Sequence, residues 1–105
     1  MNRALRTGVA AAAVAALAAG SLPAFAANLM RGQQLYQMHC AACHGMRGEG
    51  VVPDAPKFRL GERLNQPDVQ LMQSVRTGSK TMPPFFGILK DGEILDVLGY
   101  VRTLR

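Results

Sequence analysis

The chain has 105 residues, 49% of them hydrophobic, and a formal charge of +5 at pH 7, which allows one small domain and no second one. Its basic residues are scattered without interleaved aromatic side chains, so the composition gives no support for nucleic-acid binding. A domain this small buries only about 60% of its unfolded surface, and it needs an additional source of apolar core because it lacks tryptophan and a second pair of cysteines.

Residues 1–26 have the composition of a cleaved secretory signal peptide. Two arginines precede a long run of Ala, Val and Leu, and the segment ends in the small-x-small site Ala24-Phe25-Ala26. We therefore expect export to the periplasm and a mature domain, 27–105, with a formal charge of +3. An uncleaved anchor is the alternative, because residues 7–27 are just long enough to span a bilayer. The alanine content and Pro23 favour cleavage, so membrane anchoring is not expected.

Helical patterns dominate the mature sequence, and no alternating run is long enough for a strand, so the expected fold class is all-α. Three helices and two long loops are predicted: helices from about Leu29 to His39, from Pro67 to Thr77 and from Asp91 to Leu104, with loops 45–66 and 78–90 between them. Asn28 and Asp91 are the expected N-caps, and Gly78 suits the end of the second helix. Loops this long in so small a domain are usually functional or disordered.

The motif C-x-x-C-H, from Cys40 to His44, is the attachment signature of c-type haem. Two thiols three residues apart reach the two vinyl groups of one haem, and the following imidazole points toward the iron. A thioredoxin-like dithiol requires a βαβ context that this chain does not supply. A structural zinc site needs four ligands. His39, Cys40, Cys43 and His44 lie too close together along the chain to surround a zinc ion as a tetrahedron. The sequence thus predicts one haem c, covalently bound through Cys40 and Cys43, with His44 on the iron.

Met82 is the expected sixth ligand of that iron. It lies in a loop well separated from His44, and the two prolines that follow it stiffen the loop and fix the direction of the thioether. Simple packing of Met82 is the alternative. The other methionines of the mature chain lie next to the motif or on helix faces that suit the core: Met38 and Met46, and Met30 and Met72.

With these motifs the mature chain resembles the bacterial class I cytochrome c family over nearly its whole length. The matching segments are Gly32-x-x-x-Tyr36, Cys40-x-x-Cys43-His44-Gly45, Met82-Pro83-Pro84-Phe85 and Gly99-Tyr100-Val101-Arg102-Thr103-Leu104. The resemblance implies a small helical fold of three or more helices, with long loops wrapped around one haem. It also implies that the first and last helices cross, where Gly32 and Tyr36 meet Val97 and Tyr100.

The resemblance further implies that a proline carbonyl holds the histidine ring by its free N–H. Pro56 is the expected residue, and Pro53 is its rival. Because the chain has no tryptophan, the haem propionates are left to cationic side chains, with these candidates: Arg59, Arg63 and Lys80. The residues after the methionine loop are expected to line the haem pocket: Phe85, Phe86 and Ile88.

The predicted function is one-electron transfer between Fe(II) and Fe(III) through an exposed haem edge, without enzymatic activity. The expected partners are periplasmic or membrane-bound redox proteins, which a monomer meets through small, transient interfaces. The alternative is a haem protein that binds a small molecule or reduces peroxide, which requires Met82 to leave the iron. A permanently docked subunit of an oxidoreductase is a third interpretation.

Overall fold

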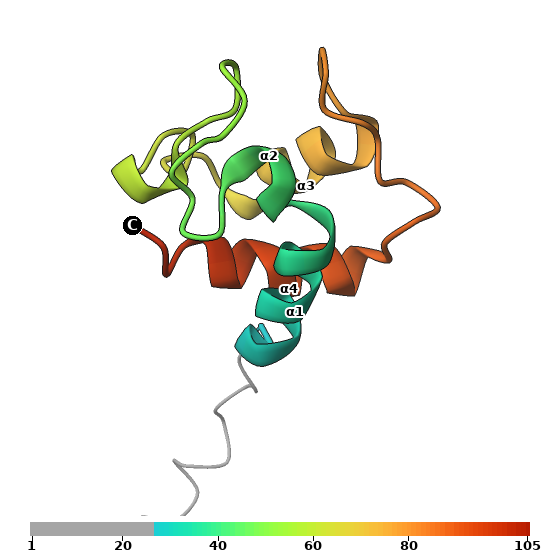
Figure 1. Cartoon of the computed structure of the whole chain (residues 1–105). Helices are drawn as coiled ribbons and strands as arrows, with labels where there is room; N and C mark the ends of the chain where they lie inside the picture. The colour runs from blue at the N-terminus through green and yellow to red at the C-terminus, as the bar shows by residue number, and fades with distance from the viewer. Residues whose placement is uncertain (1–26) are drawn as a thin grey trace, which may run out of the picture.

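Within residues 27–105, which the computed structural model describes, the chain forms four α-helices and one 3₁₀ helix (Figure 1). In chain order these are α1 (Leu29–His39), α2 (Ala41–His44), η2 (Phe58–Leu60), α3 (Asp68–Thr77) and α4 (Asp91–Val101). This part of the chain contains isolated bridges but no strand, so the all-α fold class is confirmed. The predicted signal peptide, residues 1–26, lies outside the described residues. No described helix is long and apolar enough to cross a membrane.

Side chains satisfy free backbone N–H groups where α1 and α4 begin. At α1 the Asn28 side chain accepts a hydrogen bond from the N–H three residues later (3.0 Å), as its predicted capping role requires. At α4 the N-cap is Lys90 and not the predicted Asp91. The reason is that the Glu93 carboxylate reaches back to the Lys90 N–H (2.9 Å), so the helix starts one residue earlier than its first acidic side chain suggests.

Helix α4 ends at Val101, three residues before its predicted end, because the N–H groups of Thr103 and Leu104 bond to carbonyls only three residues earlier. Arg102 follows and fastens the chain before α3 to this end of α4. Its guanidinium donates to the carbonyls of Leu64 (2.8 Å) and Gln66 (2.9 Å). It also donates to the Asp68 carboxylate (2.7 Å), which belongs to the first turn of α3.

Helices α1 and α4 cross in close contact, as predicted. A Cβ atom on Gly32 would lie 2.0 Å from the carbonyl oxygen of Asp96, so only glycine allows this approach. The rings of Tyr36 and Tyr100 fill the adjacent space, with centroids 5.4 Å apart and planes tilted by 57°. The backbone N–H of Asn28 adds a hydrogen bond to the Asp96 carboxylate (2.8 Å). The crossing thus joins the two ends of the described chain.

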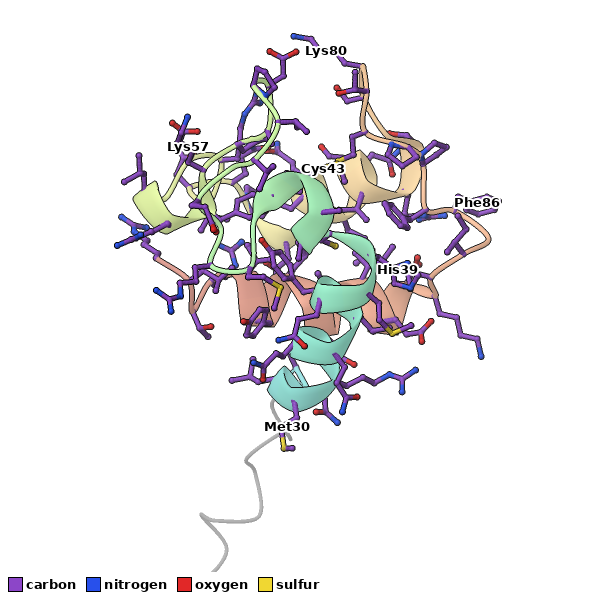
Figure 2. All side chains as sticks on the ribbon, in the orientation of Figure 1. Met30, His39, Cys43, Lys57, Lys80 and Phe86 are labelled. Atoms are coloured by element: carbon purple, nitrogen blue, oxygen red, sulfur yellow. The ribbon has the colours of Figure 1, made fainter. Side chains whose placement is uncertain are left out.

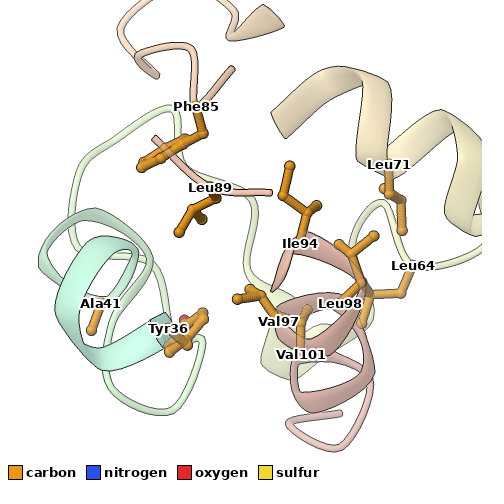
Figure 3. Packing of buried hydrophobic residues seen from close by; sticks show 10 residues of the cluster. All are labelled: Tyr36, Ala41, Leu64, Leu71, Phe85, Leu89, Ile94, Val97, Leu98 and Val101. Carbon is orange, nitrogen blue, oxygen red and sulfur yellow. The ribbon is translucent and has the colours of Figure 1, made fainter. Parts of the chain in front are cut away.

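One apolar cluster forms the core between the helices and the two long loops (Figure 3). Helix α4 supplies four of its members, and the others come from α1, α2, α3 and the loops. The cluster consists of Tyr36, Ala41, Leu64, Leu71, Phe85, Leu89, Ile94, Val97, Leu98 and Val101. Tyr36 and Ile94 are its fully buried members, so the centre of the core lies where α1 meets α4.

Three apolar residues, one expected in the core and two expected to line the haem pocket, have exposed side chains in the polypeptide. Phe86 is 73% exposed, Ile88 is 59% exposed and Met30, in the first turn of α1, is 75% exposed. Phe85 and Phe86 are consecutive in an extended segment, where neighbouring side chains point in opposite directions, so only Phe85 enters the core. The guanidinium of Arg76 lies 5.5 Å from the centre of the exposed Phe86 ring.

Candidate functional site

The two cysteines and the histidine of the motif lie where α1 ends and α2 begins. The N–H of Cys40 bonds to the Tyr36 carbonyl in α1 (2.8 Å), and the N–H of His44 bonds to the Cys40 carbonyl (2.9 Å). Both cysteines are free thiols, and Cys40 is partly buried whereas Cys43 is exposed. This short helical segment therefore brings the three predicted residues together.

Burial raises the pKa of the Cys40 thiol to about 11, and the negative charge of a neighbouring Cys43 thiolate adds to the rise. The thiolate is the nucleophilic form of cysteine, and it is scarce at pH 7 for a group with so high a pKa. The Cys40 side chain is therefore a neutral thiol at pH 7.

His44 is only 8% exposed, and contacts on two sides orient its ring. Its Nδ1 lies 3.4 Å from the carbonyl oxygen of Pro56, which can only accept a hydrogen bond, so the hydrogen belongs on Nδ1 and the lone pair on Nε2. The Phe58 ring stacks on the imidazole, with centroids 4.5 Å apart and an angle of 19° between the planes. Burial lowers the pKa of His44, although the bond to Pro56 acts in the opposite direction. The imidazole is therefore neutral at pH 7, which is the form that binds metals.

The loop after the motif folds back onto it. The buried hydroxyl of Tyr36 donates to the carbonyl of Gly45, directly after His44 (2.6 Å). The N–H of Gly50 bonds to the carbonyl of His44 (2.7 Å), so the chain reverses within a few residues. This reversal allows Pro56, and not the rival Pro53, to reach the imidazole.

Met82 lies on the second loop, in a turn that two backbone hydrogen bonds close. The N–H of Ser79 bonds to the Met82 carbonyl (3.0 Å), and the N–H of Met82 bonds to the Ser79 carbonyl (2.8 Å). Gly78, with φ of +74°, has no room for a side chain, because a Cβ atom would lie 2.6 Å from the Met82 oxygen. Met82 is partly buried and packs against the same core cluster as Cys40.

Both loops project from the same end of the molecule, on either side of α2 (Figure 1). In Figure 2, Cys43 lies on α2 at the base of these loops, and Lys80 lies at the tip of the second one. The other predicted propionate partners belong to the first loop, Arg59 in η2 and Arg63 in the next turn. Both loops thus carry cationic side chains.

These residues fit a covalently attached apolar ring that contains iron. The two thiols are unpaired, and Nε2 of the buried His44 has no hydrogen-bond partner among residues 27–105. The first loop and η2 carry large apolar side chains that are exposed in the chain alone: Met46, Val51 and Leu60. No three His, Cys, Asp or Glu side chains of the described residues converge on a point where a bare metal ion could bind.

A polar hollow of about 510 Å³ lies beside the first loop, lined by residues 53–57 together with Glu62 and Arg63. Neither the motif nor Met82 lines this hollow, and its charged lining does not suit an apolar ring. Pro56 is the residue that the hollow and the site share, because it lines the hollow and its carbonyl faces His44.

Local sequence patterns do not predict three contacts of this site: the Tyr36 hydroxyl on Gly45, the Phe58 ring on His44, and the Glu62 carboxylate on the Lys57 N–H (2.7 Å). The only signal for the first two is an aromatic side chain near the motif or near Pro56. Their partners depend on how the first loop folds back, which no local pattern describes.

Comparisons with known proteins agree with this geometry. The family model described as cytochrome C oxidase, cbb3-type, subunit III, matches residues 27–101. A cytochrome c6 of Synechococcus sp. is 38% identical and covers 77% of this chain and 74% of its own length. A cytochrome c6 of Thermosynechococcus vestitus is 37% identical, and the match covers 89% of this chain and 85% of that protein. The crystal structure of cytochrome cL from Hyphomicrobium denitrificans is similar over 70% of this chain, with a TM-score of 0.61 and 27% identity, and this chain spans 45% of its length.

Proposed function

The chain belongs to the class I cytochrome c family, and we propose that it carries single electrons on a haem held by His44 and Met82. Covalently bound haem c is the cofactor of this family, and electron transfer is its general function, so both are those of this chain. The observation that supports the ligand assignment best is the neutral, buried imidazole of His44, whose Nδ1 faces a carbonyl and whose Nε2 is left with a lone pair.

Each residue of the proposed site has a separate role. Cys40 and Cys43 hold the ring through thioether bonds, and the Pro56 carbonyl keeps His44 in one tautomer and one orientation. Met82, on a turn closed by backbone hydrogen bonds and followed by two prolines, supplies a sulfur ligand from the second loop. When bound, the haem supplies an iron that alternates between Fe(II) and Fe(III).

We place this activity in the periplasm, because residues 1–26 have the pattern of a secretory signal peptide. The donor and acceptor are then periplasmic or membrane-bound redox proteins. Co-purification from the native host would distinguish a free carrier from a docked subunit.

The ligand pair can be tested by absorption spectroscopy of protein made in a host that attaches haem. We expect a weak far-red sulfur-to-iron band in the oxidised protein and no response of the reduced protein to carbon monoxide. Met82→Ala should remove the band and allow carbon monoxide to bind. The control Met38→Ala removes an exposed methionine of α1 close to the motif and should leave both properties unchanged. Carbon monoxide binding by the wild type, with no such band, would instead indicate an open site for small molecules.

A further inference from the structure

Both polar atoms of one peptide group near His44 are engaged by side chains. The Pro56 carbonyl oxygen lies 3.4 Å from His44 Nδ1, and the N–H of the same peptide group, that of Lys57, donates to Oε1 of Glu62 at 2.7 Å. No cis peptide bond occurs in the described residues, so this C=O and this N–H point in opposite directions. One rigid peptide group therefore separates the Glu62 carboxylate from the His44 ring.

This arrangement polarises the peptide group toward the histidine. A carboxylate that accepts the N–H draws the hydrogen toward itself and increases the negative charge on the carbonyl oxygen at the other end. A more negative oxygen accepts a stronger hydrogen bond from Nδ1–H, which makes the imidazole a more basic ligand at Nε2. A more basic ligand stabilises the more highly charged, oxidised form of the iron.

The Glu62 carboxylate is not needed to close the turn in which it lies. The N–H groups of Leu60 and Gly61 bond to the carbonyls three residues earlier, those of Lys57 (3.0 Å) and Phe58 (2.8 Å), and these bonds already form the 3₁₀ turn. No ion pair joins Glu62 to a cationic side chain within residues 27–105. The Lys57 N–H is thus the contact that defines where this carboxylate lies.

We propose that Glu62 is a positioning residue for His44, acting through the Pro56–Lys57 peptide group to lower the reduction potential of the haem. This inference rests on the proposed function, because it requires His44 to bind the iron. Asp54 provides a matched control. It lines the same hollow two residues before Pro56, and its carboxylate has no hydrogen bond among the described residues that leads to His44.

The test compares Glu62→Gln with Asp54→Asn in haem-loaded protein. Each variant removes one negative charge beside the same loop, and Gln at position 62 keeps an oxygen that accepts the Lys57 N–H, so the turn is preserved. At a fixed potential we expect Glu62→Gln to raise the ratio of reduced to oxidised protein roughly threefold. This is about 28 mV, since a tenfold change corresponds to about 59 mV for one electron. The change in Asp54→Asn should be clearly smaller.

A second measurement separates polarisation from structural support. In the reduced protein, the NMR signal of the His44 Nδ1–H should move in Glu62→Gln and remain in place in Asp54→Asn, while both variants unfold at the wild-type denaturant concentration. Equal changes in potential for the two variants, or loss of stability without a change in potential, would overturn the role of Glu62. A wild type that lacks the sulfur-to-iron band and binds carbon monoxide would overturn the proposed function itself, and the absorption spectra reveal this before any variant is compared.

Discussion

Tyr36 has two functions in one side chain. Its ring packs at the crossing of α1 and α4, and its hydroxyl donates to the Gly45 carbonyl at 2.6 Å, which fastens α1 to the turn after His44. Burial raises the pKa of this phenol well above its ordinary value, so the hydroxyl remains a donor throughout the physiological pH range. The fold and the site therefore depend on the same residue.

Replacing Tyr36 with Phe should separate these two functions. The ring remains, but the buried Gly45 carbonyl loses its hydrogen-bond donor, which costs about 1–3 kcal/mol in the free energy of unfolding. Urea denaturation of the haem-loaded protein measures this loss. The control Tyr100→Phe removes a hydroxyl that has no hydrogen bond among residues 27–105 and should change stability by less than about 0.5 kcal/mol. Equal losses in the two variants would contradict the importance of the Gly45 contact.

Glu93 should give the protein a pH-dependent contribution to stability. Its pKa is lowered by the backbone hydrogen bond from Lys90 and then by the side-chain bond from Arg31. A lowered carboxyl pKa contributes stability that is fully present above the ordinary value of 4.5 and is lost as the pH falls through the lower, folded value. Glu93→Gln should therefore be less stable than wild type at pH 7, and this difference should shrink below about pH 4. A difference that stays constant between pH 7 and pH 3, measured by denaturant unfolding, would contradict this.

At the scale of helices and loops, local signals predicted some features and not others. Asn28 predicts the start of α1 because an N-cap acts within one turn of the helix. For the same reason Gly78 predicts the end of α3. The four residues of α2 carry no periodicity, so this helix was not expected as a separate element. Loop contacts depend on tertiary folding, which explains why local patterns predict neither the exposure of Phe86 nor the Glu62 contact. The motif predicts that His44 lies close to the two cysteines. The orientation of its ring, however, is set by the carbonyl of Pro56, twelve residues further along the chain.

The crossing of α1 and α4 should tolerate no side chain at position 32. Gly32→Ala places a Cβ atom 2.0 Å from the Asp96 oxygen, so the helices must separate, at a cost of about 1–3 kcal/mol or more. Gly92→Ala is the control in α4, since nothing lies within 4 Å of the added carbon. It should stabilise the protein by about 0.4–1 kcal/mol through the unfolded state. Thermal unfolding followed by circular dichroism measures both changes, and destabilisation by Gly92→Ala would contradict this account.

At the scale of the whole molecule, ten buried apolar side chains form the core of residues 27–105, which is little for a stable domain. The attached haem should therefore supply much of the stability as well as the chemistry. The variant Cys40→Ser/Cys43→Ser, which cannot attach haem covalently, should lose about 3 kcal/mol or more. For a domain of this size such a loss lowers Tm by at least about 12 °C. Circular dichroism measures the difference, and equal melting temperatures would show that the chain alone carries the stability.

The crossing of α1 with α4 also has a consequence for the order of folding. The hydrogen bond from Asn28 to Asp96 joins residues 68 positions apart, so α1 gains its partner only when nearly the whole chain is present. A growing chain that lacks α4 cannot form this contact, and closing so long a loop is a slow step. The motif cysteines directly follow α1, so the helix that precedes them gains its tertiary support only when the last helix is in place.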